Sequence, residues 1–150
     1  MSTFWEIIGA SPVRTSADIE ISLQRIGGRL ESLAPAEVSR FAKDLRESLY
    51  RLDRREFGQI RVSTATGMEF PQTSDHFLYA RCACVMAGVE VYESVLKTGS
   101  GFERFVPVFA QGAESLLYLA PEIYKNKVGE GLQIAGSFPI ESMSNIEGWN

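Results

Sequence analysis

The stretch Ser74–Gly99, SDHFLYARCACVMAGVEVYESVLKTG, holds the only histidine and both cysteines of the chain, and it decides the fold. Apolar side chains recur in it at spacings of three and four residues on two neighbouring faces, which is typical of an amphipathic α-helix. The apolar surface is so wide that we expect this helix at the centre of a helical core. Ser74 is suited to cap its start and Gly99 to end it.

The reactive side chains of this helix do not form a recognisable catalytic or metal site. Residues two apart on a helix point about 200° from each other, so Cys82 and Cys84 cannot form a disulfide together or hold one metal ion. We therefore expect both to pack as small apolar residues, with no metal, no cofactor and no catalytic residue in this stretch. His76 stands in the first turn beside Asp75, where we expect it to be exposed and idle.

Arg81 is the unusual residue of the helix, because it lies on an apolar face. An unpaired buried charge would cost several kcal/mol, so the sequence predicts a carboxylate partner. The candidates are Asp53, Asp75, Glu93 and Glu122. A structural pair is the favoured interpretation, and an arginine that faces a ligand in a cleft is the alternative.

The rest of the chain predicts more helices around this one. Thr3 can cap a short apolar turn, Thr15 or Ser16 can open a second helix, and Pro35 is suited to the first position of a third. Residues 132–150, which we call the tail, lack periodicity and are expected to lie over the helices. The sequence thus predicts a mainly α protein: a compact single-domain bundle, residues 1–150, of about five to seven helices with a less regular tail.

Composition limits the classes of function. A net charge of −4, with acidic residues interleaved in the most arginine-rich segment, argues against a nucleic-acid binder. No apolar run approaches the 18 or so residues of a membrane span, so we expect no membrane insertion. The N-terminus does not look like a secretory signal, and two cysteines without such a signal favour the cytoplasm. The oligomeric state is left open.

Three segments resemble a known family: FWEIIGAS (4–11), SDHFLYARCACVMAGVEVYESVL (74–96) and ESLLYLAPEIYKNKVGE (114–130). They are similar to the bacterial domain-of-unknown-function family 4240, over about residues 3–131. The family pattern falls on Phe4, Trp5, Tyr50, Asp53, Asp75, Phe77, Arg81, Gly88, Val91, Tyr92, Glu93, Glu122 and Tyr124. The chain departs from it at LDRREFG (52–58) and TATGMEFPQT (64–73). The resemblance implies an α-helical fold and a polar set of Asp53, Asp75, Arg81 and Glu122, but no established activity.

Two hypotheses follow. The first is a non-catalytic cytoplasmic protein-binding module, in one version an immunity-type inhibitor of a cognate toxin. A mildly acidic surface would attract a basic toxin, and the tail is a candidate contact segment. The alternative is a small-molecule or metal-ion binding protein, or a hydrolase, that uses Asp53, Asp75, Arg81 and Glu122 as its ligand-binding residues. An open cleft around these four would favour the alternative, and a sealed network would favour the binding module.

Overall fold

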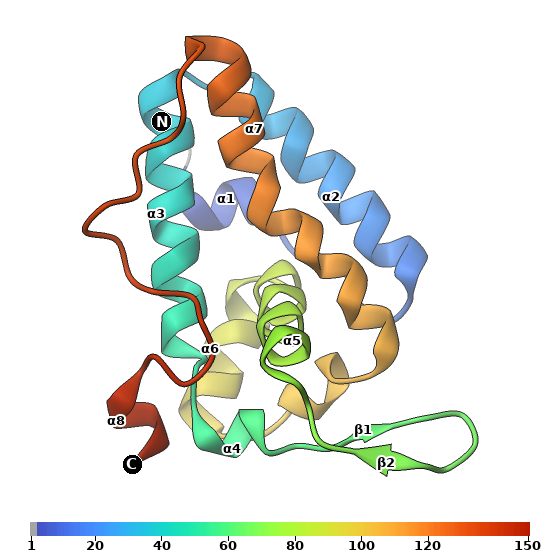
Figure 1. The fold of residues 1–150 in the computed structure, drawn as a ribbon. Helices are drawn as coiled ribbons and strands as arrows, with labels where there is room; N and C mark the ends of the chain where they lie inside the picture. The colour runs from blue at the N-terminus through green and yellow to red at the C-terminus, as the bar shows by residue number, and fades with distance from the viewer. Residues whose placement is uncertain (1–2) are drawn as a thin grey trace.

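Helix α5 (Ser74–Met86) lies in the middle of the computed structural model, which describes residues 3–150, and three other helices surround it: α2 (Ser16–Glu31), α3 (Pro35–Arg51) and α7 (Leu116–Val128) (Figure 1). The remaining elements are α1 (Phe4–Ile8), α4 (Arg55–Gly58), β1 (Val62–Ser63), β2 (Glu69–Phe70), α6 (Val89–Thr98), the 3-10 helices η1 (Phe102–Phe105) and η2 (Val108–Ser115), and α8 (Ile146–Trp149). Five of the α-helices in the described residues have ten residues or more, so the mainly α prediction is confirmed.

Three of the helices, α1, α2 and α5, begin at a threonine that satisfies a free backbone N–H group. Thr3 and Thr15 cap α1 and α2 as predicted, their hydroxyls accepting hydrogen bonds from the N–H groups two or three residues into each helix. At α5 the predicted cap was displaced by one residue. Thr73 accepts from the N–H of His76 at 3.0 Å, and Ser74 is the first residue of the helix.

The stretch 74–99 is two helices rather than the single helix that its spacing predicts. It breaks at Gly88, whose φ of +109° is in the region that favours glycine. A Cβ atom at Gly88 would lie 2.9 Å from the Cβ of Ala10 and 3.0 Å from the carbonyl oxygen of Gly9. The chain between α1 and α2 therefore closes against the turn between α5 and α6, and only glycine allows this contact.

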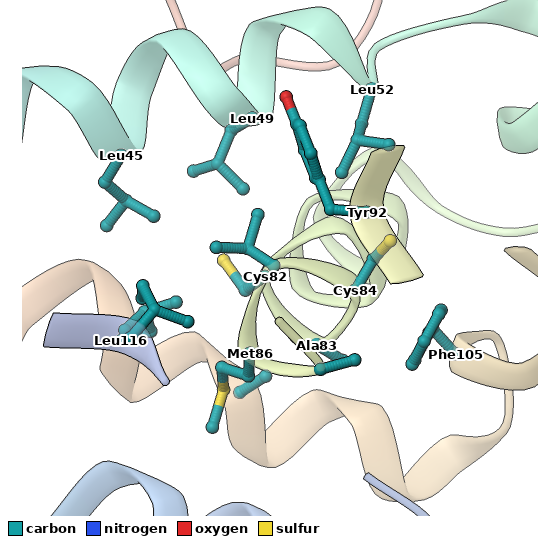
Figure 2. Packing of buried hydrophobic residues seen from close by; sticks show 14 of the residues in the cluster. Leu45, Leu49, Leu52, Cys82, Ala83, Cys84, Met86, Tyr92, Phe105 and Leu116 are labelled. Carbon is teal, nitrogen blue, oxygen red and sulfur yellow. The ribbon is translucent and has the colours of Figure 1, made fainter. Parts of the chain in front are cut away.

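The two cysteines pack in the core, as the sequence predicts. Figure 2 shows them on different sides of α5, with Cys82 toward Leu49 of α3 and Cys84 toward Tyr92 and Phe105. Both are 0% exposed, and burial raises the pKa of each thiol to about 12. Such thiols are protonated at neutral pH, so they contribute packing and not nucleophilic chemistry.

Residues 3–150 contain no helix with the length and apolar character that crossing a membrane requires. Within the same residues, no three His, Cys, Asp or Glu side chains are grouped closely enough to hold a metal ion.

The conformation of Gly88 gives a direct stability test. Gly88→Ala should lower the free energy of unfolding by about 2 kcal/mol or more, because it adds both a strained φ and a steric clash. Gly28→Ala is the matched control in the middle of α2, where an added Cβ meets no described atom within 4 Å. That change should raise stability by about 0.5–1 kcal/mol. Urea unfolding measures both, and two changes of the same sign would contradict the structure.

Candidate functional site

Arg81 is fully buried on α5, and its guanidinium hydrogen-bonds to backbone rather than to a carboxylate. Nη1 donates to the carbonyl of Leu49 at 3.0 Å, while Nη2 donates to the carbonyl of Ile140 at 2.9 Å and to the Ser142 hydroxyl at 3.2 Å. Among residues 3–150 no carboxylate forms an ion pair with Arg81 within 4.0 Å. The prediction of a direct carboxylate partner was therefore wrong. Two carbonyl oxygens and one hydroxyl accept the hydrogen bonds that were expected to go to a carboxylate.

The position of Arg81 explains why carbonyls suffice. Leu49 lies in the last turn of α3, where the helix dipole is negative and a cation is favoured. The guanidinium carbon also lies 4.6 Å from the centre of the Phe77 ring, a cation–π contact. Burial lowers the pKa of Arg81, and the nearby charge of Asp53 acts against this lowering. Asp53 thus acts on Arg81 through space, without a direct bond.

Asp53 is 1% exposed and accepts three hydrogen bonds, all from the tail. Oδ1 accepts from the N–H of Met143 at 2.9 Å and from the indole Nε1 of Trp149 at 2.8 Å, and Oδ2 accepts from the N–H of Asn145 at 2.9 Å. Both carboxylate oxygens are therefore occupied, which is what a buried charge requires. We call Asp53, Arg81 and the atoms bonded to them the Asp53–Arg81 site.

The tail crosses the helices as the sequence predicts, and it closes this site. After α7 the chain runs back along α3 as an extended trace and ends in α8 (Figure 1). Arg46 Nε donates to the carbonyl of Phe138 at 2.9 Å, and the Asn145 side chain donates to the carbonyl of Tyr50 at 3.0 Å. The Ser142 hydroxyl accepts from Arg81 and donates to the carbonyl of Ser74 at 2.7 Å.

The other two predicted site residues lie outside the Asp53–Arg81 site. Asp75, in the first turn of α5, and Glu122, on α7, are exposed. In the described part of the chain neither forms a hydrogen bond or ion pair with Asp53 or Arg81. The structure therefore brings together two of the four residues, and ligand binding by the set stays a prediction.

Asp75 instead belongs to a surface that the sequence analysis did not identify. The Tyr118 hydroxyl donates to Glu114 Oε1 at 2.9 Å, and this bond raises the pKa of Tyr118, followed by the charges of Glu114 and Asp75. Burial raises the pKa of Tyr79, and the same two carboxylates raise it further. Glu122 follows Tyr118 by one helical turn and so shares its face. We call this surface the acidic tyrosine face: Asp75, Tyr79, Glu114, Tyr118 and Glu122.

His76 is buried, contrary to the prediction that it is exposed. Its exposed fraction is 4%, and Nε2 lies 2.6 Å from the carbonyl oxygen of Val106. A carbonyl only accepts, so Nε2 carries the hydrogen and Nδ1 is free to accept from Gln111 Nε2 at 3.4 Å. His76 thus joins α5 to the chain around η1 and η2. In the sequence, the one indication that His76 is buried is its position four residues before Ala80, which puts both residues on the buried face of α5.

Removal of the buried guanidinium tests the site. Arg81→Met should lower the free energy of unfolding by about 3–5 kcal/mol, because it leaves buried acceptors on α3 and the tail without a donor and Asp53 without a nearby cation. Arg51→Ala is the control, since the Arg51–Glu47 pair is long at 3.6 Å and its side chains are 62% and 46% exposed. Its loss should cost less than about 1 kcal/mol. Equal losses for both variants in chemical unfolding would contradict the assignment.

Comparison with known proteins gives one match. A family model described as "Protein of unknown function (DUF4240)" matches residues 1–126, slightly less of the chain than the expected 3–131. No curated protein and no solved structure matches. Asp53, Asp75, Arg81 and Glu122 all lie inside the matched region, and the tail lies outside it. The chain belongs to the DUF4240 family of proteins of unknown function.

Proposed function

We propose that this protein is a non-catalytic binding module that recognises a basic partner protein through the acidic tyrosine face. The observation that carries the proposal is the arrangement of carboxylates and phenols on α5, η2 and α7, in which Glu114 accepts a hydrogen bond from the 49% exposed Tyr118. Tyrosine is enriched in protein interfaces because its ring gives contact area and its hydroxyl gives a hydrogen bond. A phenol already held by a neighbour loses less rotamer freedom on binding.

The charge of this face indicates the chemistry of the partner. The carboxylates of Glu114 and Asp75 raise the pKa of both Tyr79 and Tyr118, and the whole chain carries a net charge of −4. A basic surface would therefore be attracted and captured faster than a neutral one. The specific form we propose is an immunity-type inhibitor that covers a cognate basic toxin. Buried, protonated thiols suit the reducing bacterial cytoplasm in which we place it.

The alternative, a small-molecule or metal-ion site or a hydrolase at Asp53, Asp75, Arg81 and Glu122, has less support. The Asp53 carboxylate is saturated by three donors, and the Arg81 side chain is 0% exposed. A small substrate would reach neither residue while the tail is in place. The two remaining carboxylates belong to the exposed acidic tyrosine face, where contact with a large partner needs no cleft.

The test is capture of a partner from a lysate of the organism that encodes the protein, with three baits. The first bait is the wild type. The second, the face variant, carries Asp75→Asn, Glu114→Gln and Glu122→Gln together. The third, the control, has the same change of charge at exposed sites, through Glu20→Gln, Glu31→Gln and Glu130→Gln. We expect one basic protein on the wild-type and control baits, with affinity at least about tenfold lower for the face variant.

Two results would contradict the proposal: a captured partner that is acidic, or equal affinity for the face variant and the control. The immunity form has its own readout. The partner expressed alone should stop bacterial growth, and co-expression of the wild type or the control, but not of the face variant, should restore it.

A further inference from the structure

The Asp53–Arg81 site is built from one part of the chain and filled by another. Asp53, Phe77 and Arg81 lie within residues 1–126, which the family model matches, while the segment bonded to them lies beyond residue 126. Without that segment, a carboxylate, a guanidinium and an aromatic ring would stand open beside the end of α3. We call this arrangement the tail groove. It is a recess made by the helical core, and residues 138–149 are seated in it.

The tail groove recognises mainly the backbone of the seated segment. Arg81 binds the carbonyl of Ile140, and the two oxygens of Asp53 bind the N–H groups of Met143 and Asn145. The Met143 side chain is 63% exposed and makes no buried contact to hold the segment. Binding through backbone groups, with selected side chains such as Ile140 and Trp149 packed against the core, is how extended peptides are recognised by peptide-binding domains.

One side chain of the segment has a built subsite. The indole N–H of Trp149 donates to Asp53 at 2.8 Å, and its ring lies edge-on to Phe77 at 6.1 Å between centroids. Gly58 of α4 makes room for it, because a Cβ there would lie 2.6 Å from the Trp149 ring. Trp149 is partly buried in this subsite, and aromatic anchors supply much of the affinity at peptide and protein interfaces.

The tail does not complete the groove. The buried Nε of Arg81 has no hydrogen-bond partner among the described residues, so part of the guanidinium is unused. Met143 holds a φ of 71°, which is strained for a side chain other than glycine. A hollow of about 980 Å³ remains between the end of α3 and α8, lined by residues that include Tyr50, Arg54 and Asn145. The seated segment is therefore a partial fit.

From this geometry we propose that the tail groove is a peptide-binding site, and that residues 138–149 occupy it as an intramolecular ligand which a tryptophan-bearing segment of a partner protein replaces. The partner segment offers a carbonyl to Arg81, two backbone N–H groups to Asp53 and an indole over Gly58. It is uncharged along this contact, because Asp53 and Arg81 already balance each other. The proposal is independent of the acidic tyrosine face, whose basic partner would bind through charge.

Hydrogen exchange on the intact chain tests whether the tail can leave. The amides of Met143 and Asn145 should exchange through a local opening, at least about 100-fold faster than the most protected amides of α3 and α5. Exchange of the tail amides at the rate of the α5 core would overturn the proposal, because the segment would then be released only by global unfolding.

Peptide exchange tests what the groove binds. A specific protease site inserted after Glu130, in the exposed link between α7 and the tail, allows the full chain to be cut after folding. The probe is a fluorescent synthetic peptide of residues 137–150, and its anisotropy reports binding. We expect saturable one-to-one binding to the cut protein, and binding at least about 100-fold weaker to the uncut protein, whose own tail competes at a high effective concentration.

Variants show whether this binding uses the groove. A peptide with Trp149→Ala, or cut protein with Asp53→Asn, should bind at least about tenfold more weakly. A peptide with Ile146→Ala, which alters a 68% exposed side chain, is the control and should bind as the wild type does. Absence of binding to cut, folded protein would overturn the proposal. So would equal binding of the wild-type and Trp149→Ala peptides, or a dimer of the intact chain that exchanges tails.

Discussion

The structure depends on one constraint: the opposite charges of Arg81 and Asp53 are both buried, and they form no direct ion pair. Arg81 and Asp53 are both almost inaccessible to solvent, and such charges are tolerated only when hydrogen bonds replace the lost water. Their partners come from the last turn of α3 and from the tail. The arrangement fixes α5, the end of α3 and the tail relative to one another.

This constraint also separates the two surfaces that we propose as binding sites for a partner. The charges inside the fold are satisfied and covered, whereas Asp75, Glu114 and Tyr118 stay at the surface, where they act on one another. An exposed acidic surface suits a protein partner, and a covered groove suits a segment that can replace the one already seated there. Both proposals thus depend on the same helical core, which holds the acidic tyrosine face and the tail groove in place.

The helical class, the caps at Thr3 and Thr15 and the burial of Arg81 were predictable because each depends on local spacing or on residue type. The break at Gly88 was not, since the apolar period continues across it and the contact with Ala10 that requires glycine is distant in sequence. The partners of Arg81 were hidden for a related reason. Backbone carbonyls have no sequence signature, so the sequence offers only carboxylates as candidate partners.

The prediction of the site residues from the sequence was limited in the same way, because their partners are distant in the chain. Asp53 was one of four candidate partners of Arg81, but its three donors come from a segment without periodicity, some 90 residues later in the chain. Glu114, Tyr118 and Glu122 do carry a signal, because they recur every four residues and so share one helical face. That spacing alone does not distinguish a binding surface from an ordinary solvated helix face.

The central claim is that Asp53 holds the tail by accepting its hydrogen bonds, and a double-mutant cycle tests it most directly. Asp53→Ala and Trp149→Phe are combined, and the free energy of unfolding is followed by circular dichroism, since Trp149 is one of only two tryptophans. The account predicts a coupling of about 1–2 kcal/mol between the two changes, because each removes one end of the same bond. Additive effects, with no coupling, would contradict it.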